Sequence, residues 1–206
     1  MHCDEFLMSK LHGRLWHMTH PERFLGIMQS GAILPEPDID NKVRRKASCG
    51  EEFYPYVRFI GGVSLFDFHQ FDPESYADDF SLSNWQEFVP CLRTRWGGAV
   101  WIEIDRAQMQ ASEDFICGGC LRIRWNLERA YRHVFMPQIE AAHIGPLPTT
   151  AFKKIIFVFS KAGPFHELDW SEFDWSEFDR AEYEKLLEAW KASRKKSSAL
   201  GETSGS

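Results

Sequence analysis

The sequence predicts an α+β fold, in which a mixed β-sheet is accompanied by short helices and a C-terminal helix. One segment with helical spacing comes early, at 21–31, and several short apolar segments typical of strands follow it between loops. These segments do not alternate regularly with helices, as βαβ winding would require. With 206 residues, 44% of them hydrophobic, the chain can form one globular domain with a full core.

The first elements are a strand and a helix. "GRLWHMT" at 13–19 predicts the strand, and "PERFLGIMQSG" predicts a helix with Pro21 in its first turn and Gly31 at its end. Phe24 and Ile27 fall on one face of this helix. The segment 34–56 combines prolines with mixed charge and no sustained period, so it predicts a loop.

The middle of the chain predicts further strands, because its apolar runs are short and alternating or fully apolar. These strands are expected at 61–68, 97–105, 138–145 and 152–159, with a short helix at 81–92 and a change from strand-like alternation to a helix within 120–135.

The composition changes towards the C-terminus. "DWSEFDWSEF" is a perfect five-residue tandem duplication, too short for a repeat architecture. The next segment, "RAEYEKLLEAWKASRKK", predicts an amphipathic, charged helix. We therefore expect a main domain at 1–165, an aromatic segment and helix packed on it at 166–196, and a disordered polar tail at 197–206.

Charge and composition narrow the classes of protein. A net charge of −6 argues against binding a polyanion with the whole surface, although local basic clusters exist. No apolar run approaches the roughly 18 residues that span a bilayer, and the start lacks the pattern of a signal peptide, so we expect a soluble, cytoplasmic protein. Five cysteines, an odd number, favour reduced thiols over a disulfide framework.

Three motifs carry polar residues in a specific order. They are His17, Met18 and Thr19 followed by "FLGIMQSGAIL", then Ser64 in "GGVSLFDF", then Glu140 in "MPQIEAAHIGPLPTTAFKKIIFV". Over roughly residues 14–160 this order resembles the ADP-ribosyltransferase fold, in particular the DarT-like enzymes that use NAD. The glycine-rich phosphate motifs of other nucleotide-binding folds are absent from the chain.

The resemblance implies an NAD-dependent mono-ADP-ribosyltransferase acting as a toxin or phage-defence effector. A carboxylate beside the anomeric carbon stabilises the positive charge that develops when the bond between ribose and nicotinamide breaks. By resemblance Glu140 is this group, and His17 holds a ribose hydroxyl. We expect His17 and Glu140 on neighbouring strands lining one cleft, because both must touch one ribose.

NAD is thus the expected co-substrate. The backbone around Met18 would pair with the nicotinamide amide, and Phe68 or Tyr56 would form an aromatic wall. The residues expected to contact NAD are His17, Met18, Thr19, Ser64, Phe68 and Arg58. The alternative for the polar ones is a structural role, since strand histidines are commonly hydrogen-bonded and strand serines commonly face solvent.

Two basic clusters bear on the acceptor of the ADP-ribose. Either could meet the NAD pyrophosphate or a nucleic-acid backbone, or form a solvated charged surface. The resemblance implies a DNA or RNA acceptor and raises the question of an antitoxin partner. The residues expected to bind the acceptor are Arg44, Arg45, Arg122 and Arg124.

Two alternatives stay open. "CGGC", from Cys117 to Cys120, is half of a tetrahedral zinc site, but a second pair at suitable spacing is absent, so no metal is expected and two reduced thiols at a glycine turn are predicted. The chain could also be a non-catalytic binding or scaffold protein of the same fold, which uses its acidic, aromatic C-terminal part. Substitution of Glu140 discriminates, because only the enzyme needs the carboxylate.

Overall fold

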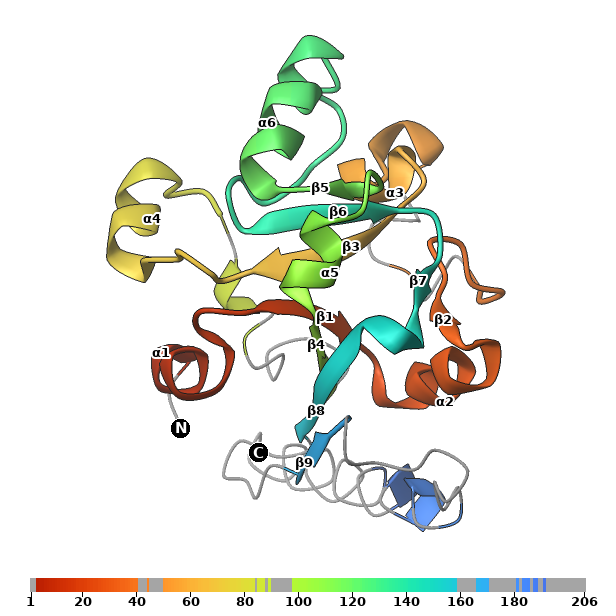
Figure 1. The fold of residues 1–206 in the computed structure, drawn as a ribbon. Coiled ribbons are helices and arrows are strands. Elements are labelled where there is room, and N and C mark those ends of the chain that lie inside the picture. The colour runs from red at the N-terminus through yellow and green to blue at the C-terminus, as the bar shows by residue number, and fades with distance from the viewer. Residues whose placement is uncertain are drawn as a thin grey trace, which may run out of the picture.

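The computed structural model describes residues 3–40, 44, 50–83, 85–87, 89, 98–158, 166–170, 181, 183–185, 187, 188 and 191. The α+β class is confirmed, since one large sheet runs through the molecule and short helices flank it (Figure 1). Among these described residues, no helix is both long enough and apolar enough to cross a membrane.

Seven strands form the large sheet in the order β5-β6-β3-β1-β4-β8-β9. Their bounds are β1 Leu15–Thr19, β3 Gly62–Asp67, β4 Ala99–Ile104, β5 Phe115–Ile116, β6 Glu140–Ile144, β8 Phe152–Val158 and β9 His166–Asp169. Each described pair of neighbours is antiparallel, so the expectation of a mixed sheet is wrong. Parallel neighbours need crossover connections such as βαβ units, and the described strands of this sheet are not joined in that way. A separate two-stranded sheet joins β2 Ala32–Ile33 to β7 Leu147–Pro148.

The helices are short. They are α1 Cys3–Phe6, α2 Pro21–Ser30, α3 Tyr56–Phe59, α4 Pro73–Asp79, α5 Arg106–Gln110 and α6 Gly118–Leu127, with a π-helical turn η1 Leu7–Leu11 and 3₁₀ turns η4 Glu51–Phe53, η5 Trp85–Glu87 and η6 Thr149–Ala151. As predicted, α2 begins at Pro21 and ends at Gly31, whose φ of 69° is the left-handed conformation of a glycine C-cap.

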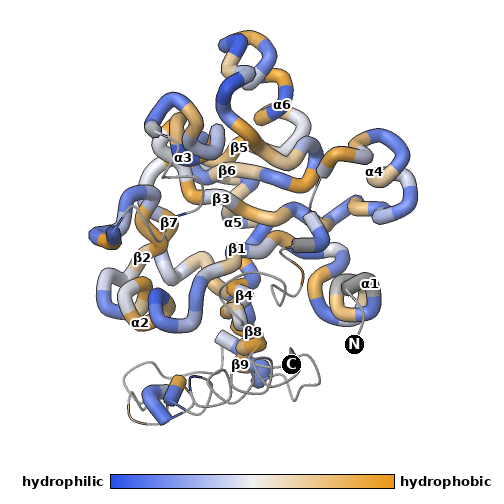
Figure 2. The backbone as a smooth tube through the Cα atoms, turned by 180° about the vertical axis from the view of Figure 1, so that it is seen from behind, coloured by the Kyte–Doolittle hydropathy of each residue, from blue (hydrophilic) through white to orange (hydrophobic). Residues whose placement is uncertain are grey.

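Alternate side chains of the strands form separate cores on the two faces of the sheet. Leu15 of β1 belongs to a cluster with Phe24 of α2, whereas Trp16 belongs to a cluster with Phe6 of α1 and Tyr76 of α4. Hydrophobic residues are prominent on the neighbouring strands β4 and β8 (Figure 2). The sheet is therefore covered by side chains and helices on both faces. A cavity can reach the strands only where this covering layer, or the sheet itself, is interrupted.

Three segments differ from the prediction. The loop expected at 34–56 contains the 3₁₀ turn η4 and the first residue of α3. The strand-like start expected near Cys120 is helical, because α6 begins at Gly118. Cys117 caps this helix by accepting from the N–H of Cys120, and the following arginines are good helix formers, so these local signals outweigh the alternation. Within the range 81–92, the described helical turn is η5, which is 3₁₀ in type.

Described residues of the C-terminal part contact the rest of the chain. Tyr183, which is 2% exposed, and Leu187 belong to the same core cluster as residues of α2. The hydroxyl of Tyr183 donates to the carbonyl oxygen of Pro21. Trp170 packs on Phe152, with ring centroids 4.9 Å apart. The duplicated segment beyond Trp170 and the predicted tail at 197–206 lie outside the described residues.

Candidate active site

Strands β1 and β3 separate in the middle of the sheet. They pair at Leu15↔Asp67 and Trp16↔Phe66. Beyond this point β1 continues along β4 as far as Thr19, while β3 continues along β6. In this described part of the sheet, no ladder joins the second half of β1 to β3, so a ligand could enter between the two strands.

A cavity of about 560 Å³ lies at this opening. Its lining includes His17, Met18 and Thr19 of β1 and Gly62, Val63, Ser64 and Phe66 of β3. Successive residues of a strand point to opposite faces of the sheet. One cavity can therefore contact successive residues of β1 and β3 only where it passes between these two strands. Its volume lies within the range of about 300–1,000 Å³ that is usual for small-molecule sites.

His17 is held at the opening by a backbone partner on β3. Its Nδ1 lies 3.0 Å from the carbonyl oxygen of Ser64. Because a carbonyl only accepts, Nδ1 carries the proton and Nε2 carries the lone pair. Burial lowers the pKa of His17 to about 4, although the bond to Ser64 acts in the opposite direction. The imidazole is therefore neutral at pH 7, and Nε2 can accept a hydrogen bond from a hydroxyl group.

Glu140 is a buried carboxylate with both oxygens engaged. The Oγ of Ser64 donates to its Oε1 at 2.6 Å, and the backbone N–H of Met136 donates to its Oε2 at 2.8 Å. The residue is 5% exposed. Burial of a carboxylate is costly unless it is hydrogen-bonded, and these two donors also fix its orientation.

His17 and Glu140 do not lie on neighbouring strands, so that prediction is wrong. Strand β3 lies between theirs. Residues that pair directly across two strands point to the same face of the sheet. His17 pairs with Ile102, which belongs to one core, and Glu140 pairs with Phe66, which belongs to the other. The two side chains therefore also face opposite sides of the sheet. The order of motifs along a chain does not fix the order of strands in a sheet. Ser64 contacts both parts of the site, because it lines the same cavity as His17 and its hydroxyl donates to Glu140.

A strained turn leads into Glu140. Gln138 has a φ of 62°, and the N–H of Ile139 donates to the carbonyl oxygen of Pro137 at 2.7 Å, which is the γ-turn pattern whose positive-φ form is rare. Gly118 of α6 packs directly on this turn, and a Cβ there would lie 2.3 Å from the carbonyl oxygen of Gln138. Close packing by α6 thus supports the turn that positions the carboxylate.

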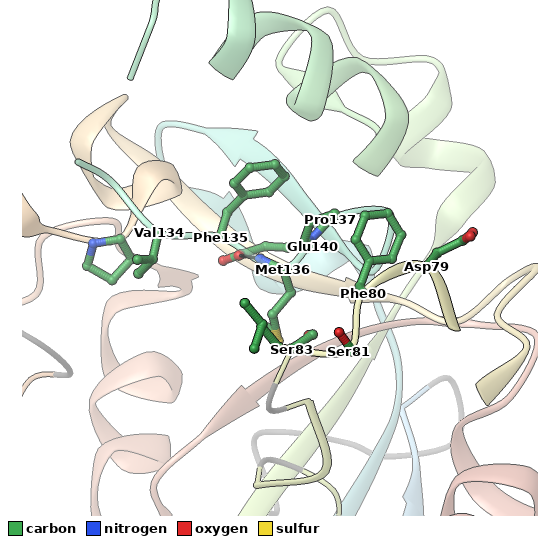
Figure 3. Close-up of a pocket in the computed structure, with 11 residues that line it drawn as sticks. Asp79, Phe80, Ser81, Ser83, Val134, Phe135, Met136, Pro137 and Glu140 are labelled. Atoms are coloured by element: carbon green, nitrogen blue, oxygen red, sulfur yellow. Dashed lines mark hydrogen bonds between the residues drawn. The ribbon is translucent and has the colours of Figure 1, made fainter. Parts of the chain in front are cut away.

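A second cavity, of about 480 Å³, lies on the side of Glu140. In Figure 3 the rings of Phe80 and Phe135 stand on either side of Glu140. Met136 and Pro55 line this cavity and also the first one, so the two cavities adjoin. Glu140 therefore lies where a molecule in the second cavity could approach one in the first.

Three arginines, Arg23, Arg44 and Arg58, line the first cavity. Arg58 donates from Nε to Glu36 at 2.6 Å, and Arg44 donates to the same carboxylate. Burial acts to raise the pKa of Glu36, but the hydrogen bonds from the two arginines outweigh it and lower the pKa. Burial and then the charge of Arg44 lower the pKa of Arg23. An anion bound in this part of the cavity would relieve the repulsion between these cations.

The aromatic wall differs from the prediction. Phe68 follows the end of β3 and is fully buried in a cluster with Phe66 and Trp101, away from the cavity. Tyr56 is also buried, and its hydroxyl donates to Glu128 at 2.8 Å. The aromatic residue of β3 at the cavity is Phe66. Met18, Thr19 and Arg58 do line the cavity.

The arginines predicted to bind the acceptor separate into different environments. Arg44 lines the first cavity rather than the second. The guanidinium of Arg122 lies 5.4 Å from the ring centre of Phe80, which lines the second cavity, whereas Arg122 itself is not a lining residue. Arg124 forms an ion pair at 2.7 Å with a glutamate four residues further along α6. Arg45 lies outside the described residues.

Several lining residues were missed from the sequence. Arg23, Ile27 and Ser30 of α2 recur at spacings of four and three, so this stripe of the helix was a usable signal. Phe80 and Phe135 carry no such signal. They are 55 residues apart in the chain (135 − 80), and only the fold brings them together.

The site combines a neutral imidazole, a hydroxyl, a buried carboxylate and a cationic wall. In the part of the chain that the structure describes, no three His, Cys, Asp or Glu side chains are grouped so that they could hold a metal ion. Comparison with known proteins gave no match among family models, curated proteins or solved structures.

Proposed function

We propose that this chain is an NAD-dependent mono-ADP-ribosyltransferase that transfers ADP-ribose from NAD to a nucleic acid, as a toxin or phage-defence effector. The observation that carries the proposal is the hydrogen-bonded connection from His17 through Ser64 to Glu140, at an opening of the sheet with a cavity on either side. A neutral acceptor for a ribose hydroxyl and a fixed carboxylate are the groups that this chemistry uses.

The first cavity suits the parts of NAD. The pyrophosphate would meet the cationic wall of Arg23, Arg44 and Arg58, since guanidinium groups bind phosphate oxygens well. Apolar side chains such as Ile27 suit the flat faces of the bases. The Nε2 of His17 would accept a hydrogen bond from a ribose hydroxyl.

Glu140 would act on the bond between ribose and nicotinamide. This requires the ribose to extend through the opening between β1 and β3, because Glu140 lines the second cavity and faces the other side of the sheet from His17. As that bond breaks, positive charge develops on the ribose, and the carboxylate stabilises it without reorganising, because Ser64 and Met136 already hold its oxygens. The nucleophile of the acceptor then bonds to the anomeric carbon and gives up a proton, for which Glu140 is a suitable base. Nicotinamide leaves, and the acceptor carries the ADP-ribose.

The acceptor would approach Glu140 from the second cavity. Phe80 and Phe135 offer two aromatic surfaces there, and stacking of a base on an aromatic side chain is worth about 1–3 kcal/mol. Arg122, over the ring of Phe80, places a cation next to one of these aromatic surfaces. These groups favour a nucleic-acid base over an aliphatic protein side chain as the acceptor.

The test is NAD turnover by the full-length chain. Labelled NAD is incubated with the protein and with single-stranded DNA, RNA or cell extract, and the labelled product is treated with nuclease or protease. Glu140→Gln should lower turnover by about 10²-fold or more, because an amide does not offset the developing charge. The amide fits the site, since its oxygen can accept from Met136 and its nitrogen can donate to the Ser64 hydroxyl.

Glu103→Gln is the matched control. Glu103 is 7% exposed on β4 and pairs with Arg14 at 2.7 Å, and it lines neither cavity. This variant should keep wild-type turnover. Equal turnover by wild type and Glu140→Gln would contradict the proposal. Binding of NAD without release of nicotinamide would favour a binding protein instead.

A further inference from the structure

The pair formed by Cys117 and Cys120 lies at the start of α6, and the proposed transferase does not use it. We propose that these two cysteines are a redox-active dithiol, which exchanges with low-molecular-weight disulfides and closes to an intramolecular disulfide. Cys117 is the attacking thiol, and Cys120 is the resolving thiol. This inference is independent of NAD chemistry, so either can fail without the other.

The two sulfur atoms lie within reach of each other. They are 2.9 Å apart, and both thiols are free in the described structure. Cys117 is the N-cap of the ten-residue helix α6, and Cys120 follows one turn later. A disulfide bond is about 2.05 Å long, so a small side-chain movement closes it, and the backbone already has the required turn.

Hydrogen bonds distinguish the two thiols. The Sγ of Cys117 accepts from the backbone N–H of Cys120 at 3.3 Å, and the two sulfur atoms are in hydrogen-bond contact at 2.9 Å. The partial positive charge of a helix N-terminus further favours a thiolate at the cap. The hydrogen bond to Cys117, and to a lesser extent burial, raises the pKa of Cys120. Cys117, which lies at the helix cap and lines the adjacent cavity, is therefore assigned as the attacking sulfur, and Cys120 as the resolving sulfur.

A small disulfide has access to this pair. A cavity of about 320 Å³ lies beside Cys117, and the two glycines of "CGGC" form part of its wall. At Gly119 no atom lies within 4 Å of an added Cβ, so this side of the turn is open. Cys120 is exposed. Cys117 is partly exposed and lines this cavity, so a small disulfide can approach it from this side.

The thiol–disulfide exchange takes place in two steps, in which bonds, protons and electrons balance. The thiolate of Cys117 attacks one sulfur of the disulfide RSSR, forms the mixed disulfide Cys117–S–S–R and releases RS⁻, which takes the proton that Cys117 lost. Cys120 then loses its proton and attacks the sulfur of Cys117, and the second RS⁻ leaves with that proton. Two electrons pass to the small disulfide, which yields two RSH and one intramolecular disulfide.

The experiment uses the full-length chain with its other three cysteines replaced, namely Cys3→Ser, Cys49→Ser and Cys91→Ser. The reduced protein is equilibrated in glutathione buffers with an increasing oxidised fraction, alkylated, and analysed by mass spectrometry of the peptide that contains both remaining cysteines. We expect loss of both free thiols together as one internal disulfide, which excess reduced glutathione reverses.

Single variants assign the roles. Cys120→Ser should accumulate a glutathione adduct on Cys117, because no second thiol resolves it. Cys117→Ser keeps a residue that can cap α6, and its Cys120 should form the adduct about ten-fold more slowly. The proposal is overturned if both thiols stay reduced in oxidised glutathione, if the two variants react equally fast, or if the pair holds zinc that blocks exchange.

Discussion

The hydroxyl of Ser64 donates a 2.6 Å hydrogen bond to the carboxylate of Glu140, although 76 residues separate them in the chain. The carbonyl oxygen of Ser64 accepts from the Nδ1 of His17. One residue of β3 therefore connects two side chains whose strands are not neighbours and whose faces of the sheet differ. The proposed chemistry depends on this middle strand as much as on the two outer motifs.

Ser64→Ala tests this connection. Loss of the hydroxyl removes the donor to Oε1 of Glu140, so the carboxylate is less well oriented. We expect kcat for NAD turnover to fall by about 10-fold, with a smaller change in KM, because the hydroxyl mainly orients the carboxylate. Ser64→Thr keeps a hydroxyl and should recover most of the turnover. Wild-type kcat in Ser64→Ala would exclude an orienting role.

His17 should make stability depend on pH in a defined window. Its pKa is about 4 in the folded protein against 6.5 as the ordinary value. Between these values the unfolded chain binds a proton that the folded His17 does not, so the free energy of unfolding decreases as pH falls, by at most about 1.4 kcal/mol per pH unit. The slope is half its maximum at pH 6.5 and almost vanishes about one pH unit above it, where neither state binds the proton.

Urea unfolding of wild type and His17→Gln from pH 4 to 7 measures this effect. The variant should lose less stability than wild type as the pH is lowered. His12→Gln, at an exposed position, is the control and should follow wild type. Parallel curves for wild type and His17→Gln would show that the folded imidazole titrates normally.

Gly118→Ala should disturb the turn before Glu140. The new Cβ would lie 2.3 Å from the carbonyl oxygen of Gln138, so α6 or the turn must move. We expect a loss of about 1–3 kcal/mol in stability and a fall in NAD turnover. Gly119→Ala is the matched control, because no atom lies within 4 Å of its added Cβ. Equal behaviour of the two variants in thermal unfolding and turnover would contradict the close packing.

Tyr183 should anchor the C-terminal segment. Tyr183→Phe removes the hydrogen bond to the Pro21 carbonyl and should cost about 1 kcal/mol. Tyr183→Ala also empties a buried space against Phe24 and Phe157, and should cost about 3–5 kcal/mol. Lys185→Ala, at an exposed position, should change stability by less than about 0.5 kcal/mol. Unfolding in urea measures all three, and unchanged stability of Tyr183→Ala would mean that the segment is only an appendage.

The sequence by itself determined the elements that depend on local signals. The helix α2 follows from Pro21 and Gly31, whose backbone preferences act within a few residues. The strands β1, β3, β4, β6 and β8 follow from short apolar runs. Histidine and glutamate stand out on two of these strands because their polarity is unusual there, and both are found lining cavities.

Only the tertiary structure decided how these elements meet. The position of β3 between β1 and β6, and the separation of β1 from β3 that opens the cavity, depend on pairings between distant residues. Packing between distant segments also decides that Phe66 rather than Phe68 lines the first cavity. It likewise brings Phe80 and Phe135 together around Glu140. Propensity and alternation act over a few residues, whereas strand order, side-chain environment and cavity shape arise from packing between segments far apart in the chain.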